Sequence, residues 1–208
     1  MSSIAMAAPG SKAEAKPEVQ PDFLRLENRH TGEILRMRRM RDAKGGMMLS
    51  LDSSLPPGRS GPPLHVHFYE HEGGTVKAGT LGARVGGKTM IVPAGGTAVL
   101  PAGVAHAWWN SGDDLLELSG HVAPVVDLDR YLQAVFAVVN AGPFGQPPIF
   151  YMAHVMWRHR HTQQLAMPPR IIQRIVFPVI ILIGHLLVKY QGGNWPGSPA
   201  SCPGAPEE

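Results

Sequence analysis

The sequence has 208 residues, of which 44% are hydrophobic and 17% are charged, enough apolar material for one domain of ordinary size with a buried core. The 24 glycines and 20 prolines favour turn-rich β structure and exclude a coiled coil. The formal net charge of +3 is too small an excess to indicate binding to nucleic acid, and we expect no nucleic-acid partner.

Both ends of the chain have the composition of tails. Residues 1–21 mix alanine, serine, proline and charges without periodicity, and they lack the continuous apolar run of a secretory signal. We expect a disordered tail there and a second, flexible tail over 191–208, which Trp195 pins to the body. Because the single cysteine, Cys202, can form no internal disulfide, we expect a cytoplasmic protein, with membrane association through the C-terminal helix as the alternative.

Residues 22–124 are predicted to form a β-barrel domain. Short apolar or alternating runs are separated by glycine, proline and aspartate at intervals of roughly ten residues. Many short strands with tight turns indicate a sandwich or a small barrel. Four arginines, from Arg36 to Arg41, are interpreted as the solvated face of an edge strand. The predicted strands are 34–40, 47–51, 64–68, 75–78, 82–85, 88–92, 97–100, 106–109 and 115–121.

Residues 125–190 are predicted to form a helical extension, with helices over about 126–139, 149–165 and 169–190. The third contains a 14-residue uncharged run, IVFPVIILIGHLLV, and a membrane-spanning helix needs about 20 residues. Two interpretations stay open: a packed helix or homodimer interface, and peripheral membrane contact through 171–190, which preceding arginines would suit. The histidines at 154, 159 and 161 are interpreted as surface residues.

Three histidines and one glutamate in the barrel region are the candidates for chemistry. His65 and His67 are two apart on a predicted strand, so both imidazoles project into whatever the sheet encloses. Two buried imidazoles are costly unless a ligand uses them. Glu72 has the opposite parity and returns to the same side if the chain turns within 69–71. A tight turn precedes the strand that carries His106, so three imidazoles and one carboxylate can converge from three strands.

Such a group suits one divalent transition metal ion, because imidazole is a borderline ligand that accepts iron, manganese, nickel, copper or zinc. With four protein ligands, an octahedral ion keeps two positions for water, dioxygen or two substrate oxygens. A structural zinc site is more often closed and rich in thiolate, and no cysteine is near these residues in the sequence.

These residues resemble the two motifs of the cupin family, written G-x5-H-x-H-x(3,4)-E-x6-G and G-x5-P-x-G-x2-H-x3-N. In the first, Arg59 stands where the opening glycine is expected. The resemblance covers about 35–122 and implies a mainly β fold, a single jelly-roll-like cupin β-barrel with a C-terminal helical extension. Its implied metal ligands are His65, His67, Glu72 and His106. The residues that match the motifs are His65, His67, Glu72, Gly79, Gly95, Pro101, Gly103, His106 and Asn110.

The chain departs from the family pattern after Glu72, where cupins usually have a large apolar residue two places on and this chain has Gly74. Gly74 is expected to share the inward face with Glu72. Either the pocket beside the metal is wider, or another side chain fills the gap. Trp108 shares the parity of His106 and lines the cavity or belongs to the ordinary barrel core.

Two further polar residues, Tyr69 and His121, are candidates for contacting a ligand or substrate, although either also fits a rim position. His71, next to Glu70, is interpreted as part of a solvated turn.

The preferred hypothesis is a metal-dependent oxygenase, of dioxygenase type, acting on a small apolar or aromatic molecule, with iron among the candidate metals. Glu72 would be a ligand and the proton acceptor for the substrate. Two alternatives remain. One is a non-oxidative isomerase, decarboxylase or lyase in which the ion stabilises an enolate. The other is a non-catalytic barrel that binds a small ligand, because this fold hosts many chemistries.

Overall fold

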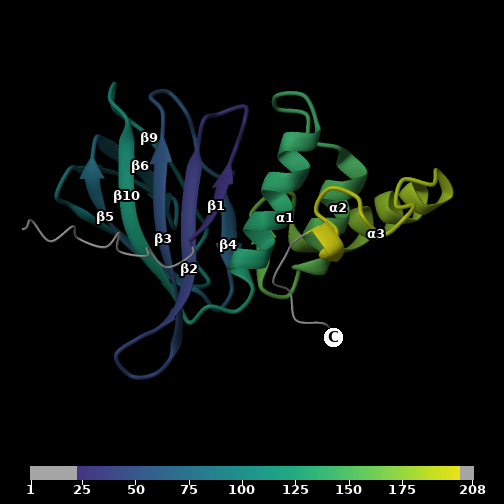
Figure 1. Ribbon diagram of the computed structural model, residues 1–208, viewed down its shortest axis with the longest axis horizontal. Coiled ribbons are helices and arrows are strands. Elements are labelled where there is room, and N and C mark those ends of the chain that lie inside the picture. The colour runs from purple at the N-terminus through teal and green to yellow at the C-terminus, as the bar shows by residue number, and fades with distance from the viewer. Residues whose placement is uncertain (1–22, 202–208) are drawn as a thin grey trace, which may run out of the picture.

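The computed structural model describes residues 23–201, in which two antiparallel β-sheets form a barrel and three helices follow it (Figure 1). The whole predicted N-terminal tail, 1–21, and residues 202–208 of the C-terminal tail lie outside the described residues. The predicted domain boundaries, 22–124 and 125–190, remain a prediction.

The larger sheet has six strands and the smaller has five. The larger sheet runs in the order β1 (Leu24–Glu27), β2 (Ile34–Arg41), β3 (Met47–Leu55), β10 (Leu116–Ala123), β5 (His71–Ala78) and β8 (Thr97–Leu100). The smaller sheet runs in the order β11 (Gln163–Leu165), β4 (His65–His67), β9 (His106–Asn110), β6 (Thr80–Val85) and β7 (Lys88–Pro93). The two sheets face each other, which is the jelly-roll-like arrangement that the motifs imply.

Alternation along the strands builds the core, because successive side chains point to opposite faces. One buried apolar cluster lies between the sheets, and each of its larger side chains contributes about 1.5–3 kcal/mol by burial. It consists of Leu55, Val76, Leu81, Ala83, Ala98 and Leu116. A second cluster, which includes Met37, Val122 and Leu128, joins the barrel to the first helix.

All nine predicted strands are present, with ends shifted by up to four residues, and two further strands, β1 and β11, were not predicted. The interpretation of the arginine segment as an edge strand is wrong for Arg36, because β2 pairs with both β1 and β3 over 34–37, whereas over 38–41 it pairs with β3 alone. Arg39 is bound through Nε and Nη2 to the carboxylate of Asp129, at 2.7 and 2.6 Å.

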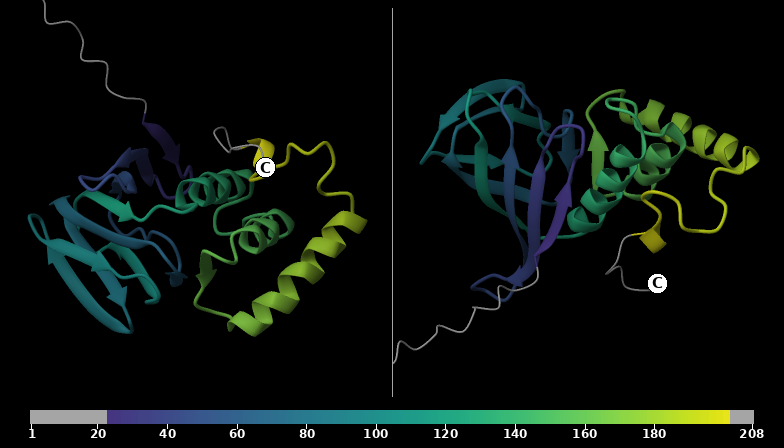
Figure 2. Two further views of the ribbon diagram at one scale, coloured as in Figure 1. Left: turned by 90° about the horizontal axis from the view of Figure 1, so that it is seen from below. Right: turned by 45° about the horizontal axis from the view of Figure 1, so that its top comes forward.

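The helices α1 (Leu128–Ala141), α2 (Ile149–Arg158) and α3 (Arg170–Leu186) lie on one side of the barrel, with α3 outermost (Figure 2). The start of α1 is fixed to the barrel by Glu70, whose Oε1 accepts the backbone N–H groups of Val126 and Leu128 at 2.8 and 3.2 Å. A carboxylate at this place also interacts favourably with the helix dipole.

The predicted helix over 149–165 is wrong at its end. The helix α2 stops at Arg158, and Gln163 to Leu165 form β11, which pairs with β4 in antiparallel register, Gln163 opposite His67 and Leu165 opposite His65. The free edge of β4 supplies hydrogen-bonding groups that a continued helix would leave unpaired. The extension is therefore built into the sheet next to two of the candidate ligands.

The interpretation of the histidines at 154, 159 and 161 as surface residues is also wrong for His159. That side chain is buried, and its Nδ1 lies 2.6 Å from Oδ2 of Asp127, just before α1. Trp195 pins the following segment to the helices as expected, since it is buried and its ring stacks on Tyr151, with centroids 5.5 Å apart. A short 3-10 turn over Pro199–Ser201 ends the described chain.

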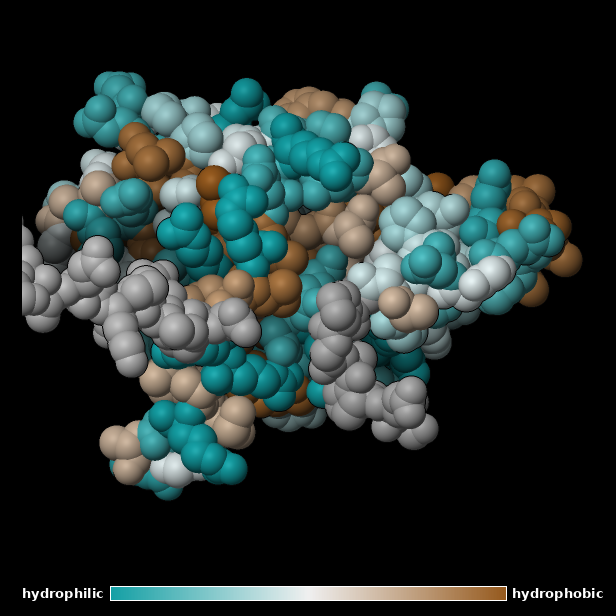
Figure 3. Space-filling model, in the orientation of Figure 1, coloured by the Kyte–Doolittle hydropathy of each residue, from teal (hydrophilic) through white to brown (hydrophobic). Residues whose placement is uncertain are grey.

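The helix α3 packs against α2 and exposes an apolar outer face; hydrophobic residues gather at that end of the molecule in Figure 3. Gln173 and Gly184 are buried on its inner side. Within residues 23–201, no helix combines the length and apolar character that crossing a membrane requires. The compartment stays a prediction.

Candidate metal centre

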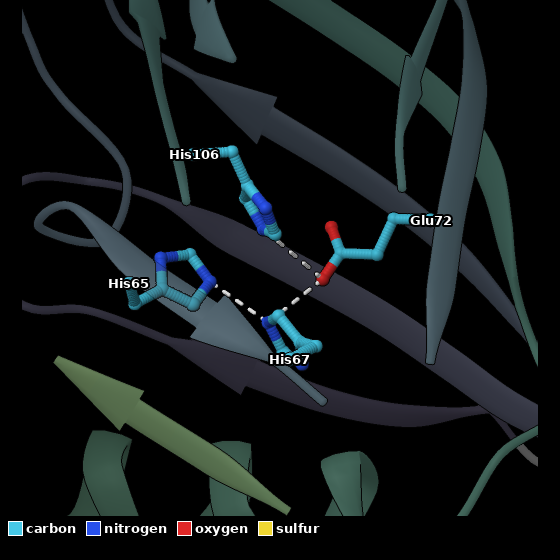
Figure 4. Close-up of side chains that lie close together, drawn as sticks. All are labelled: His65, His67, Glu72 and His106. Atoms are coloured by element: carbon cyan, nitrogen blue, oxygen red, sulfur yellow. Dashed lines mark hydrogen bonds and ion pairs between the residues drawn. The ribbon is translucent and has the colours of Figure 1, made fainter. Parts of the chain in front are cut away.

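Four side chains converge inside the barrel: His65 and His67 of β4, Glu72 of β5 and His106 of β9 (Figure 4). The three histidines are buried, and Glu72 is half-buried. One ligand atom from each residue lies within 4.8 Å of the other three. These residues, which we call the four-residue cluster, are the four that the sequence selected.

The local structure explains why they meet. His65 and His67 are two residues apart on β4, so their side chains point to the same face. His65 lies directly opposite His106 of the neighbouring strand β9. The chain reverses between His67 and His71, which brings Glu72 to the same side. Nε2 of His67 lies 2.8 Å from Nε2 of His65 and 3.0 Å from Oε1 of Glu72, and Nε2 of His106 lies 3.9 Å from that oxygen.

The outer nitrogen of each imidazole faces an acceptor, and this orients the inner nitrogens. Nδ1 of His65 donates to the Pro63 carbonyl at 2.8 Å, and Nδ1 of His106 donates to the Val104 carbonyl at 2.9 Å. Nδ1 of His67 lies 3.4 Å from Oε2 of the buried Glu70. For His65 and His106 the partner is a carbonyl, which can only accept, so the proton is on Nδ1 and the lone pair on Nε2 points to the centre.

Burial favours the neutral form of His65 and His106. It lowers the pKa of His65 to about 3, and the neighbouring His67 and His106 act in the same direction. Burial also lowers the pKa of His106, although Glu72 opposes the shift. Neutral imidazole is the form that binds metal ions.

This donor set fits a divalent metal ion. The Nε2 atoms of His65 and His67 are 2.8 Å apart, so one cation could bind both nitrogens. Nε2 of His106 is buried and has no hydrogen-bond partner, and such a group carries a desolvation cost that a metal bond would remove. Three imidazoles and one carboxylate suit iron, manganese, nickel, copper or zinc alike.

Two cavities adjoin the cluster. The smaller, of about 80 Å³, is inside the barrel. The larger, of about 370 Å³, lies between the barrel and α1 and α2, and includes His65, His67 and Glu72 in its wall. The rest of that wall is mainly apolar, which suits a small organic ligand. Its apolar side chains include Leu35, Leu132, Val135, Phe136, Val139, Met152 and Met156.

The structure brings some of the predicted pocket residues to these cavities. Trp108 lines both, and its ring lies so close to Gly61 that a Cβ there would stand 2.6 Å from it. Gly74 lines the smaller cavity, so space remains beside Glu72. A Cβ at Gly74 would lie only 3.2 Å from the backbone oxygen of Ser119, so the approach of β10 also requires a small residue.

Tyr69 and His121 have less favourable positions. Tyr69 is 59% exposed and is not part of either cavity wall. His121 borders the smaller cavity, but its register opposite Gly73 turns it away from the face that carries Glu72, and it is exposed. Neither residue is placed to contact a ligand in the larger cavity.

Two functional candidates were missed. Glu70 is buried and links His67 to the start of α1, whereas its turn was interpreted as solvated. Glu33 is buried in the wall of the larger cavity. For Glu70 a weak signal existed, since it is three residues after His67 in the turn that must reverse the chain. For Glu33 there was none.

Comparison with known proteins identifies the class of the barrel. Residues 52–122 match the cupin domain family, so this part of the chain is a cupin domain. A curated protein of Hypocrea virens, named "Probable oxidoreductase virH", is 37% identical over 54 residues, which are 26% of this chain. The match spans 25% of that protein's length.

Solved structures with a similar barrel include KdgF from Halomonas sp., with 18% identity, coverage of 51% of this chain and 89% of that chain, and a TM-score of 0.41. A predicted oxalate decarboxylase from Thermotoga maritima has 24% identity, coverage of 50% and 92%, and a TM-score of 0.40. The Cnp3 cupin domain of Schizosaccharomyces pombe has 15% identity, coverage of 44% and 65%, and a TM-score of 0.38.

Proposed function

We propose that the protein is a metal-dependent enzyme of the oxygenase type that acts on a small, mainly apolar molecule. The observation that carries the proposal is the convergence of three imidazoles and one carboxylate beside a mainly apolar cavity of about 370 Å³, whose wall includes His65, His67 and Glu72. The partial similarity to a protein named as an oxidoreductase points in the same direction.

Different residues of this chain would have different roles in the reaction. His65, His67, Glu72 and His106 would hold one divalent ion, which supplies Lewis acidity and open positions for substrate and dioxygen. The apolar wall from α1 orients the substrate and excludes water. Glu72 borders the cavity and is the group in the cluster able to accept a proton from a substrate hydroxyl.

The dependence of turnover on dioxygen distinguishes the proposed oxygenase from two alternative functions. A non-oxidative isomerase, decarboxylase or lyase would turn over its substrate at the same rate without dioxygen, since an enolate needs only electrostatic stabilisation. A barrel that only binds its ligand would show neither oxygen uptake nor turnover.

The first experiment is the metal content of the full chain by mass spectrometry, for the wild type, His65→Ala and His106→Ala. We expect close to one equivalent of a single transition metal in the wild type and loss in both variants. His71→Ala is the matched control, because His71 is exposed in the adjoining turn and is outside the cluster. Oxygen uptake with a panel of enols and phenols follows, using the metal found. A wild type that stays empty after reconstitution with all five metals contradicts the enzyme.

We also propose that the outer face of α3 binds a second copy of this chain to form a homodimer. Ile172, Ile175, Val179, Leu182 and Leu186 recur at alternating intervals of three and four residues, the spacing of paired helices. Their exposed fractions run from 43% to 74%. With the adjacent apolar residues, the exposed area is on the order of 800 Å², above that of the largest patch on a typical monomer and close to one side of a standard interface.

The charges favour a second copy over lipid. Arg170 and Arg174 lie at the N-terminal end of α3, and no formal charge lies between Ile175 and Leu186. Antiparallel pairing about a two-fold axis places these arginines near the C-terminal end of the partner helix, where the dipole favours cations. A helix lying on an anionic membrane usually has basic residues along its polar face.

Sedimentation equilibrium of the full chain, with flotation on vesicles of phosphatidylcholine and phosphatidylserine, separates the two partners. We expect a dimer that does not float with the vesicles. A monomer that binds the vesicles would instead establish peripheral membrane contact through 171–190.

A further inference from the structure

The larger cavity contains one carboxyl group outside the four-residue cluster, that of Glu33. It follows the turn after β1 and lines the cavity, with a side chain that is 5% exposed. Its backbone is fully used, since its N–H donates to Thr31 Oγ1 at 3.3 Å and its carbonyl accepts from the Asn28 N–H at 2.9 Å.

The carboxyl group itself has no hydrogen-bond or ion-pair partner within residues 23–201. Burying such a group without a partner costs free energy, and native proteins rarely keep one without a use. Burial alone raises the pKa of Glu33 to about 7.

The surroundings define what this carboxyl group can do. Leu35, Phe136 and Val139 line the same cavity and supply no donor. Asn28, Thr31 and Ser60 also line this cavity, but none of them is hydrogen-bonded to the Glu33 carboxyl group. Its oxygens are therefore an unpaired polar position in a mainly apolar wall, and such positions fix the orientation of a ligand. A ligand without a hydrogen-bond donor leaves this carboxyl group desolvated and unpaired, which weakens binding. A ligand with a donor forms a hydrogen bond to the carboxyl group and avoids this cost.

We propose that Glu33 is a specificity-determining residue that accepts a hydrogen bond from a hydroxyl or amino group on an otherwise apolar ligand. The inference rests on the proposed function for the identity of the cavity as the substrate site. It adds that the substrate has a donor group apart from the atoms that approach the four-residue cluster.

The test compares probes that differ only in the donor. 4-Cyclohexylphenol and 4-cyclohexylaniline carry one, whereas 4-cyclohexylanisole carries an ether oxygen in its place. Binding to the metal-loaded full chain is measured by calorimetry at pH 8. We expect the phenol and the aniline to bind roughly 10–100-fold more tightly than the anisole, as a hydrogen bond to a charged group predicts.

Glu33→Leu should reduce this preference to less than about threefold while metal content stays at the wild-type value. Glu33→Gln keeps the shape of the side chain and should give an intermediate preference. It provides the test if the leucine variant does not fold. Glu117→Leu is the matched control, because Glu117 is exposed on β10, and it should keep the full preference.

The same probes are measured on His106→Ala, since a phenol could also bind a metal. A preference for the donor-bearing probes that persists in His106→Ala and is lost when Glu33 is changed supports the inference. It does so even if the proposed metal centre is wrong. A wild type that binds all three probes equally, or none of them, overturns it. So does a preference that Glu33→Leu leaves unchanged.

Discussion

The centre of the barrel and the outer face of α3 depart from the usual distribution of residues in opposite ways. In the barrel, His67, Glu70 and His106 are almost completely buried, whereas on α3 Ile175 and Leu186 are 63% and 74% exposed. Buried polar groups need a partner, and a large exposed apolar patch needs a cover. We have proposed different partners for the two regions, a cation for the first and a second copy of the chain for the second, so substitutions should disrupt each without the other.

The largest effect is expected from Leu182→Asp on α3. A two-fold interface contains each substitution twice, and two desolvated carboxylates should weaken self-association by at least about 1000-fold. Sedimentation equilibrium measures the change. Metal content should stay at the wild-type value, because Leu182 is outside the four-residue cluster. Ile91→Asp is the control, since Ile91 is 55% exposed on β7. A Leu182→Asp dimer of unchanged affinity would place the interface elsewhere.

The next largest effect is expected in the pH dependence of protein stability, through Glu33. Its folded-state pKa of about 7 lies above the ordinary value of 4.5, so the folded chain holds a proton that the unfolded chain has released. The contribution of Glu33 to the free energy of unfolding is therefore fully present below about pH 4.5. It is lost as the pH rises through the folded-state pKa of about 7. The loss approaches roughly 3 kcal/mol.

Glu33→Leu should remove this slope and raise stability above pH 7. Urea unfolding at a series of pH values from 5 to 8 checks it, with Glu117→Leu as the exposed control. Parallel curves for the wild type and Glu33→Leu would show that the buried carboxyl group has a partner.

The smallest of the three effects is expected at Glu70. Glu70→Gln keeps an oxygen for the N–H groups of Val126 and Leu128, but its amide would face Nδ1 of His67 with a donor. The protonated nitrogen of His67 would then be Nε2, which can no longer bind a metal. Loss of such a supporting partner typically lowers metal affinity by about 10–100-fold.

Metal competition with a chelator measures this change, and Glu117→Gln is the control for the loss of a charge. An unchanged affinity would mean that Glu70 serves only to fix α1, and thermal unfolding would then report its whole effect.

Local pattern predicted the parts of the fold that depend on neighbouring residues. The parity of His65 and His67, the need for a turn before Glu72 and the tight turn before His106 were enough to anticipate that these side chains meet. The alternation of two residues per repeat in a strand fixes the face of each side chain. Their role as metal ligands remains a prediction.

Features that depend on distant partners could not be predicted in this way. The strand β11 has only three residues, too few for a period, and it exists because β4 offers a free edge. Glu70 is buried because the start of α1 covers it, and His159 because Asp127 approaches it. Glu33 is buried by residues of α1 that lie far along the chain. Apart from the weak signal at Glu70, these contacts leave no mark in the local sequence.

The pairing of β11 with β4 has a consequence for how the protein is made. Synthesis proceeds from the N-terminus, so the residues of the four-residue cluster emerge before β11. The strand that holds His65 and His67 completes its hydrogen bonding only when Gln163 to Leu165 arrive, after α1 and α2. Contacts between segments so far apart in the sequence form slowly. The barrel strand that carries two residues of the four-residue cluster is therefore fully paired only after residues 163–165 have been synthesised.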